Sequence, residues 1–436
     1  MNQITEKEAL QKRIQVPENT MILGDGIYYD LDTYKTMRNN NVVVIGSPGS
    51  CKTRGIIIPN ILQASGSYVI TDPKGNLYEK YHRYLRRKGY VVKAIDFMDA
   101  QKSIGYNCIA KAETEDEISS LAHTIIYSSR DMSRFYGDQF WNESGELLLT
   151  ALLCFVRFYC ETNEWTFSSI VKLLNAGNVG EDYSDMTTKL DQLFADVAKV
   201  APSSMAVRKY NAFRVAASRT LKSIIITLQS TIGSFDTPSV QSVMERRDEL
   251  NIADIGKRKT AVFITVSDTD RRLDGLVNIV FTQIMQSLVK AADHSPGQHL
   301  PIPVRFLMDD FATNVTLTDF PRMIASIRSR WISTMLILQA EAQLKERYGE
   351  DGRTILGSCD TYVYLGGEDI ETAQNVSLRA DKSLKEILEM PLGTGLIFRR
   401  GDKMVKSRTF PLEEFERTLR SKSRKEISHD EIGYAN

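Results

Sequence analysis

The run Val42-Val-Val-Ile-Gly-Ser-Pro-Gly-Ser-Cys-Lys-Thr53 decides the fold of this chain. Its four β-branched residues, Val42 to Ile45, predict a buried strand, and the glycine and serine residues after them predict a loop. The loop departs at one position from the phosphate-binding pattern G-x-x-x-x-G-K-[ST], because Cys51 stands where the pattern has its second glycine. An apolar helix is expected over residues 55–62. The order strand, loop, helix therefore predicts a nucleotide site.

The loop is expected to bind ATP with Mg²⁺. Successive backbone N–H groups would curl around the phosphates, helped by the positive N-terminal end of the next helix. The predicted ATP-binding residues of the loop are Gly46, Ser47, Pro48, Gly49, Ser50, Cys51, Lys52 and Thr53. Lys52 would reach the β- and γ-phosphates, and Thr53 would ligate Mg²⁺. The alternative is a glycine-rich turn without a ligand.

Cys51 is a chemical departure from the pattern. Glycine at this position lets the backbone approach the ligand without a Cβ in the way. We therefore expect nucleotide binding, with slow turnover as one consequence of the substitution.

Length and composition set the limits of the fold. A chain of 436 residues is too long for one ordinary core and suggests two or three lobes. Apolar residues make up 42% and charged residues 25%, which is typical of a globular protein. Basic and acidic residues number 55 each, so any surface that binds nucleic acid must be a local one.

The cysteines and the hydropathy predict a cytoplasmic chain. Five cysteines, an odd number without C-x-x-C spacing, argue against a disulfide framework and against a zinc site. We expect no metal site apart from nucleotide-bound Mg²⁺. The most apolar run, residues 147–156, is about half of the ~20 residues that a transmembrane helix needs. We therefore expect no transmembrane segment and no signal peptide.

The pattern along the chain predicts an α/β fold. Short apolar strands alternate with helices over residues 21–104 and 251–415, which indicates a nucleotide-binding domain with a mainly parallel sheet. Helical periods dominate residues 105–250, so we expect an all-α domain inserted there. Residues 1–20 are a polar N-terminal segment, and residues 416–436 are a charged tail.

A second acidic motif follows the predicted strand Val304-Arg-Phe-Leu-Met308. Asp309 would organise Mg²⁺ through water, and Asp310 would polarise the attacking water as the catalytic acid–base residue. The alternative for a lone Asp-Asp pair is a turn or a helix N-cap. Asp310 is one methylene shorter than the glutamate common in such ATPases, so it is a second reason to expect slow turnover.

Two further strand ends supply candidate site residues. Gln339 closes the strand over residues 333–338, where it would sense the γ-phosphate or hold the water; a polar strand cap is the alternative. Asp72, in the run Thr71-Asp-Pro-Lys-Gly75, would line the phosphate site together with Lys74. The alternative for this run is an ordinary Asp-Pro turn.

Several motifs together resemble one family. In chain order they are Gly46-Ser-Pro-Gly-Ser-Cys-Lys-Thr53, Thr71-Asp-Pro-Lys-Gly75, Asp138-Gln-Phe-Trp141, Leu307-Met-Asp-Asp-Phe-Ala312 and Ile337-Leu-Gln-Ala-Glu-Ala-Gln-Leu344. The set resembles the type IV secretion coupling proteins of the TraG/VirD class, over about residues 21–415. The resemblance implies a conjugation ATPase with a RecA-like P-loop motor and an inserted all-α domain.

The same resemblance implies partners. It implies a homo-hexamer that handles single-stranded DNA or nucleoprotein in a central channel and works with type IV secretion channel proteins. The all-α domain would recognise the relaxase and its cargo, with Trp141 as a core residue. The family pattern places an arginine that reaches the neighbouring subunit's nucleotide on the helix after the acidic pair; Arg328 matches best, and Arg330 is the second choice. A solvated helix face is the alternative for these arginines.

The resemblance implies a location at the membrane. Family members usually begin with transmembrane helices, which this sequence does not predict. We expect a cytoplasmic chain, located peripherally at the inner face of the membrane or held there by a separate anchor subunit. The alternative function is a nucleotide-binding cargo adaptor with weak or no motor activity. A helicase-like or pilus-assembly ATPase fits the helical insertion less well.

Basic clusters are the sequence features that could contact DNA directly. They lie at residues 80–88 and 420–425, and Tyr78, Tyr81 and Tyr84 interleave with the first of them. A basic helix with tyrosines could follow a nucleic-acid backbone, and a solvated helix face explains it at least as well.

Overall fold

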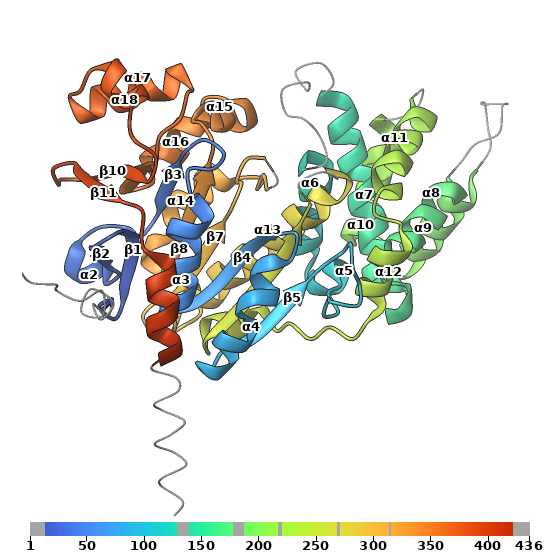
Figure 1. The fold of residues 1–436 in the computed structure, drawn as a ribbon. Helices are drawn as coiled ribbons and strands as arrows, with labels where there is room; N and C mark the ends of the chain where they lie inside the picture. The colour runs from blue at the N-terminus through green and yellow to red at the C-terminus, as the bar shows by residue number, and fades with distance from the viewer. Residues whose placement is uncertain are drawn as a thin grey trace, which may run out of the picture. The chain divides into compact units, whose positions relative to one another are not determined.

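The computed structural model describes residues 14–128, 139–177, 187–216, 220–267, 271–313 and 315–421 (Figure 1). Most of the predicted N-terminal segment and the end of the tail, residues 1–13 and 422–436, lie outside these ranges. The chain forms two compact units, here called unit 1 and unit 2. Unit 1 comprises Met1–Gly66, Ser333–Ala342 and Leu356–Asn436, and unit 2 comprises Ser67–Ile332 and Gln343–Ile355.

Unit 1 carries the strand that precedes the phosphate loop. Its five sheet strands follow the order β11-β10-β9-β3-β8, in which β3 runs parallel to both neighbours and the β9-β10-β11 pairs are antiparallel. A separate antiparallel hairpin forms where the Gly24-Asp25-Gly26 turn predicts it. The elements are β1 (Thr20–Gly24), β2 (Ile27–Asp30), α2 (Thr33–Thr36), β3 (Val42–Ile45), a π-helical turn η1 (Thr53–Ile57), α3 (Ile58–Gln63), β8 (Ile332–Leu338), β9 (Thr361–Tyr364), α17 (Ile370–Ala380), α18 (Leu384–Leu388), β10 (Thr394–Arg399) and β11 (Val405–Arg408).

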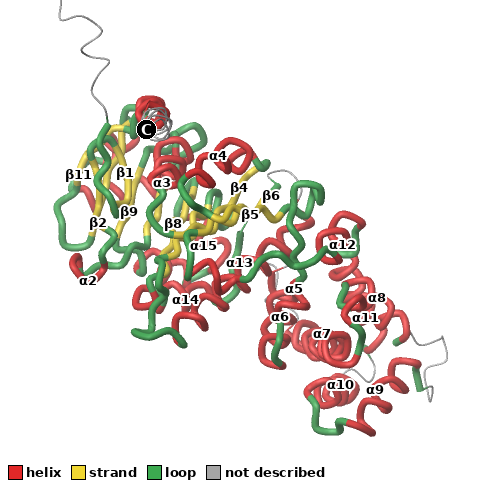
Figure 2. Tube along the Cα trace, turned by 90° about the horizontal axis from the view of Figure 1, so that it is seen from below, coloured by secondary structure: helices red, strands yellow, loops and turns green. Residues whose placement is uncertain are grey.

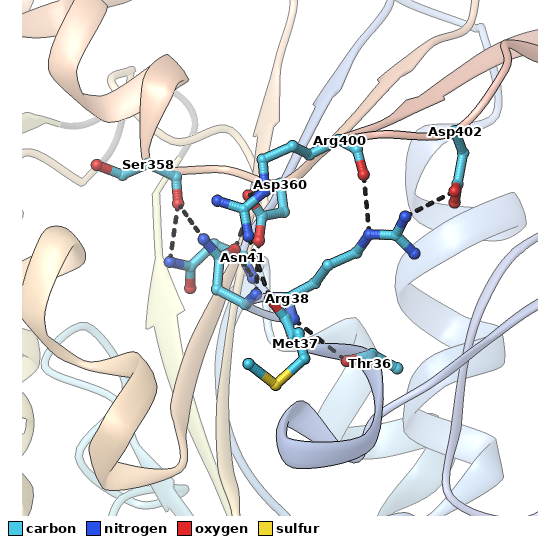
Figure 3. Close-up of polar contacts among 9 residues, drawn as sticks. Thr36, Met37, Arg38, Asn41, Ser358, Asp360, Arg400 and Asp402 are labelled. Carbon is cyan, nitrogen blue, oxygen red and sulfur yellow. Dashed lines mark hydrogen bonds and ion pairs between the residues drawn. The ribbon is translucent and has the colours of Figure 1, made fainter.

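A polar network fixes the start of β3 (Figure 3). The buried Asp360 accepts a hydrogen bond from Asn39 N at 2.6 Å and forms an ion pair with Arg400 at 3.0 Å. Arg38 Nε donates to the Arg400 carbonyl at 2.8 Å, and its guanidinium pairs with Asp402 at 2.6 Å. Asn41, directly before β3, donates to the Ser358 carbonyl at 3.1 Å. These contacts set the register of β3 on β9, where Val42 lies opposite Thr361.

Unit 2 carries the acidic strand. Its four strands follow the order β7-β4-β6-β5, and all of their pairs are parallel. The strands are β4 (Ser67–Pro73), β5 (Val91–Ile95), β6 (Thr260–Val266) and β7 (Val304–Met308). The helices and turns connected with them are α4 (Asn76–Arg87), η4 (Ile252–Gly256), η5 (Arg271–Leu273), α13 (Asp274–Asp293), α14 (Phe320–Ser326), η6 (Arg328–Arg330), α15 (Ala342–Tyr348) and α16 (Asp351–Gly357), which ends in unit 1. The prediction of an α/β fold with a mainly parallel sheet is confirmed.

The remaining helices of unit 2 pack on one another. α7 contacts α6, α8, α10 and α11, and α6 packs in turn on α13 (Figure 2). The bounds are α5 (Cys108–Lys111), α6 (Glu115–Ser128), α7 (Gln139–Tyr159), η3 (Thr162–Glu164), α8 (Phe167–Ala176), α9 (Lys189–Val200), α10 (Met205–Ala216), α11 (Leu221–Gly233) and α12 (Pro238–Glu245). The limits 105 and 250 of an inserted domain stay a prediction.

Candidate nucleotide site

The phosphate loop leaves the carboxyl end of a fully buried strand. Ile45, the last residue of β3, lies opposite Leu338 of β8 and Tyr364 of β9. Two backbone bonds continue these pairings into the loop, from Gly46 N to the Leu338 carbonyl at 3.1 Å and from Ser47 N to the Gly366 carbonyl at 3.0 Å. Helical structure follows from Thr53. The structure therefore has the predicted order of strand, loop and helix, and the first residues of the loop are anchored on both sides.

The loop backbone turns through two left-handed residues. Gly49 has φ +82° and Cys51 has φ +65°. Glycine takes such angles freely, whereas a residue with a Cβ pays about 1–2 kcal/mol. Gly46 is required for a different reason, since a Cβ there would lie 2.4 Å from Ser50 Oγ. Cys51 thus adopts the conformation for which the pattern uses glycine, and the curled loop forms in spite of its side chain.

Two side chains of the loop are arranged for an anion. The Lys52 ammonium is buried and folds back over the loop, with Nζ 2.5 Å from the Gly46 carbonyl oxygen and 2.9 Å from that of Ser47. Within the described part of the chain, the buried Ser50 Oγ has no hydrogen-bond partner. A buried hydroxyl without a partner costs about 1–3 kcal/mol. A phosphate oxygen would satisfy this hydroxyl, so the residues present fit a nucleotide.

Gln339 lies at the same edge of the unit 1 strands as the phosphate loop. It is exposed and follows Leu338, the partner of Ile45 across β3 and β8. Further along the same segment, the carboxylate of Glu341 accepts hydrogen bonds from Tyr362 Oη at 2.8 Å and Asn375 Nδ2 at 2.6 Å. Sequence reasoning gave Glu341 no role. Its signal was an acid three residues beyond a strand end.

The acidic pair lies at the end of β7 in unit 2. Asp309 is 4% exposed, and Thr71 Oγ1 on the parallel strand β4 bonds both its backbone N–H and its carbonyl oxygen. One carboxylate oxygen of Asp309 accepts a hydrogen bond from Asp310 N at 3.1 Å. Asp310 is half-buried and has φ +51°. The pair therefore consists of one buried acid and one accessible acid, as their different predicted roles require.

Asp72 has the contacts of a helix cap. Its side chain is fully buried, and its two oxygens accept hydrogen bonds from Leu77 N at 2.8 Å and Tyr78 N at 2.7 Å, in the first turn of α4. Burial raises the pKa of this carboxyl to about 6, against the stabilising effect of the two N–H donors. These contacts account for Asp72 without a ligand. Its predicted contact with ATP stays a prediction.

The arginine proposed to act on a neighbouring subunit lies beyond the helix on which it was expected. α14 ends at Ser326, and Arg328 opens the short turn η6 in a half-exposed position. Arg330 is engaged in an ion pair with Asp293, with 2.6 Å between Nε and Oδ1, and this pair lowers the pKa of Asp293. The contact makes Arg330 less suited to a neighbour's nucleotide.

The basic helix α4 does not present its tyrosines to solvent. Tyr81 is buried, Tyr78 packs edge-on against Phe263 at 5.7 Å between ring centroids, and Tyr84 is half-buried. Arg83, Arg86, Arg87 and Lys88 are exposed. This surface can contact phosphates through its cations, whereas its tyrosines are poorly placed to stack on bases. Residues 422–425 of the other basic cluster lie outside the described residues.

The motif at the start of α7 is described only in part. Asp138 lies outside the described residues, and Trp141, predicted as a core residue, is half-buried and packs edge-on against Phe140 at 5.8 Å. Of the helices in the described ranges, none is both long and apolar enough to cross a bilayer.

A protein family and two named relatives match most of this chain. A sequence profile of the family described as "Type IV secretory system Conjugative DNA transfer" matches residues 2–382. Protein VirD4 of Rhizobium radiobacter is 23% identical over 345 residues, which are 77% of this chain and 47% of VirD4. The conjugal transfer protein TraG of Escherichia coli is 24% identical over 359 residues, 77% of this chain and 54% of TraG. The chain thus spans about half the length of these relatives.

Solved structures share the fold. The plasmid coupling protein TrwB in complex with ADP and Mg²⁺ superimposes with a TM-score of 0.64 at 15% identity, covering 93% of this chain and 92% of TrwB. VirB4 of Thermoanaerobacter pseudethanolicus gives a TM-score of 0.51 at 13% identity, covering 91% of this chain and 98% of VirB4. The RecA-like fold is confirmed by the TrwB likeness. With a family profile that matches nearly its whole length, the chain belongs to the conjugative DNA transfer family of type IV secretion systems, the coupling proteins.

Proposed function

We propose that this chain binds and hydrolyses ATP, and that hydrolysis moves DNA or a relaxase-bound nucleoprotein into a type IV secretion channel. The observation that carries nucleotide binding is the loop of residues 46–53, which combines left-handed turns, a folded-back lysine and a buried serine hydroxyl without a partner among the described residues. Membership of the family supports conjugative transfer as the process that hydrolysis serves.

Each site residue has a proposed task. Lys52 holds the γ-phosphate, Gln339 senses it, and Asp310 accepts a proton from the attacking water. Thr53 and Asp309 are the residues that would hold Mg²⁺, which when bound neutralises charge on the phosphates. Arg328 acts on the nucleotide of a neighbouring copy.

The proposed assembly follows from the family. It is a homo-hexamer that handles DNA, receives the relaxase through residues 105–250, and meets the channel proteins at the inner face of the membrane, with a separate anchor subunit. The exposed cations of α4 are a candidate contact for the DNA backbone. Contacts of this kind weaken steeply as salt rises, because binding releases counterions from the phosphates.

The test is the rate of ATP hydrolysis with and without single-stranded and duplex DNA, with Lys52→Ala as the inactive reference. We expect DNA to stimulate turnover of the wild type. Binding of ATP with a turnover that DNA leaves unchanged, under conditions in which the protein assembles, would contradict a motor.

A second candidate is a nucleotide-binding cargo adaptor. The two departures from the residues common in such ATPases, Cys51 for glycine and Asp310 for glutamate, favour it. Asp310→Asn discriminates the two functions, since it removes the proton acceptor and keeps the size of the side chain. A motor loses cargo transfer with this substitution, and an adaptor keeps it.

A further inference from the structure

The loop after the acidic pair contains two strained residues. This acidic loop, residues 309–313 and 315–317, has Asp310 at φ +51° and Ala312 at φ +66°. Left-handed angles at such residues persist only where the surroundings hold them. Within the loop, Thr313 N donates to the Asp310 carbonyl at 3.2 Å and Ala312 N to the Val315 carbonyl at 2.9 Å. These two bonds close turns within the loop. They do not attach the loop to the rest of unit 2, so other contacts must do so.

Three side chains of α15 supply those contacts. Arg347 Nε donates to the Ala312 carbonyl at 2.9 Å, directly at the second strained residue. Gln343, one helical turn earlier, donates from Nε2 to Thr313 Oγ1 at 2.8 Å. Tyr348 Oη accepts a hydrogen bond from Leu317 N at 3.0 Å. Residues four apart share one face of a helix, so Gln343 and Arg347 hydrogen-bond to the loop from neighbouring positions on α15.

An apolar cluster fixes α15 against the same loop. The ring of Tyr348 stacks on Phe311 with centroids 6.0 Å apart and planes at 13°, and Phe320 lies 6.4 Å from Tyr348. Burial raises the pKa of Tyr348, which keeps its phenol neutral. On the opposite side, Asn278 Oδ1 on the buried helix α13 accepts a hydrogen bond from Thr316 N at 2.8 Å. The acidic loop is therefore held between α13 and α15.

We propose that Gln343, Arg347 and Tyr348 are positioning residues for Asp310. Their proposed role does not involve contact with the attacking water or the γ-phosphate. They keep the strained turn in place, so that the Asp310 carboxylate faces the attacking water in one orientation. The inference rests on the proposed ATPase function and adds to it an element that determines the rate. Arg347 is central, because its bond to the Ala312 carbonyl acts two residues from the catalytic acid.

The test compares substitutions at Arg347 with a matched control on α15. Arg347→Ala removes the donor, Arg347→Lys retains one, and Glu346→Ala changes an exposed neighbour. Loss of this bond should lower kcat about five- to tenfold, as expected for a hydrogen bond of ordinary strength. The Kd for ATP should stay within about twofold, because the loop positions chemistry and not the nucleotide. Arg347→Lys should recover most of kcat, and Glu346→Ala should not change it.

A second readout separates this inference from the proposed function. Hydrogen exchange of the Ala312, Thr313 and Leu317 amides should accelerate in Arg347→Ala, while amides of β6 stay protected. Normal kcat in Arg347→Ala beside an active wild type overturns the positioning role and leaves the ATPase standing. A wild type that does not hydrolyse ATP overturns the proposed function. In that case hydrogen exchange alone decides whether α15 holds the loop. Unchanged exchange of the three amides in Arg347→Ala overturns that role as well, and faster exchange supports it.

Discussion

Replacing Cys51 by glycine tests whether the departure from the phosphate-binding pattern limits this protein. At φ +65°, the cysteine backbone carries a strain of about 1–2 kcal/mol that glycine would not have. Glycine also makes the loop more flexible before a ligand binds, which costs about 0.4–1 kcal/mol. The difference leaves a gain between zero and about 1.6 kcal/mol. Because 1.4 kcal/mol corresponds to a tenfold change in Kd, a loop that curls only when ATP binds gains at most about fifteenfold, with about fourfold as the central expectation.

The assay is titration of Cys51→Gly and Cys51→Ala with a fluorescent ATP analogue in the presence of Mg²⁺. The alanine variant is the matched control, because it removes the exposed thiol and keeps the Cβ that causes the strain. We expect the glycine variant to bind about fourfold more tightly than the alanine variant, and the alanine variant to match the wild type. The reverse substitution, Gly49→Ala, should weaken binding, because Gly49 has φ +82° and open space around its Cβ position.

Two results would refute this reasoning. A gain of about a hundredfold or more in Cys51→Gly exceeds any backbone strain and would mean that the Cβ itself blocks the nucleotide. Weaker binding by the glycine variant would mean that the stiffness of a residue with a Cβ matters more than its strain. The first result would mean that the loop described here is not the conformation that binds ATP, and the second would mean that strain at Cys51 does not limit binding.

Further predictions concern four residues. Lys52→Ala should lower kcat at least about a hundredfold, and Lys52→Arg should not restore it, because the ammonium is enclosed by its own loop; steady-state hydrolysis measures both. Asp310→Glu restores the usual acid, but it should slow turnover, since a longer side chain is less tolerated at φ +51°; single-turnover kinetics decide the matter. Glu341→Ala should lower kcat with little change in the Kd for ATP, because Tyr362 and Asn375 lose the carboxylate that fixes the strand end. Asp72 has a pKa of about 6 in the folded protein against an ordinary 3.8, so the folded state binds its proton more tightly than the unfolded state does. The free energy of unfolding should therefore fall by about 1.4 kcal/mol from pH 5 to pH 7.5. Urea unfolding of the wild type and of Asp72→Asn should show this loss only in the wild type.

The nucleotide half of the fold was predictable because its signals are local. A run of β-branched residues followed by a glycine-rich loop specifies β3 and the phosphate loop within twelve positions. The same holds for β7, whose apolar run ends at two carboxylates. The helix α13 had no such signal: residues 275–282 are all buried, so its sequence lacks the polar face that reveals an amphipathic helix. β11 was missed for the opposite reason, because its four residues, Val405–Arg408, are mostly polar.

The contacts that position the site could not be predicted from sequence. Asp72 was predicted to contact phosphate. The hydrogen bonds that its oxygens accept from N–H groups five and six residues later depend on the geometry of the turn, which sequence alone does not reveal. Arg328 was placed on a helix because helix ends are poorly defined in sequence, and α14 stops two residues earlier. The hydrogen bond from Arg347 to the Ala312 carbonyl joins residues 35 apart, and no local sequence pattern indicates it.

The two chemical departures, Cys51 and Asp310, share a left-handed backbone. This conformation is unfavourable for the cysteine and is tolerated by the aspartate. Both residues are left-handed, at φ +65° and φ +51°. Aspartate is among the residues enriched in this region, whereas cysteine is not, and the local contact of Cys51, from Sγ to the Gly49 carbonyl at 3.8 Å, is a weak one. A glutamate in place of Asp310 would lose that advantage, so the shorter acid suits the turn in which it lies. Slow turnover, if measured, should therefore be traced first to Cys51 and the phosphate loop, and only then to the acid.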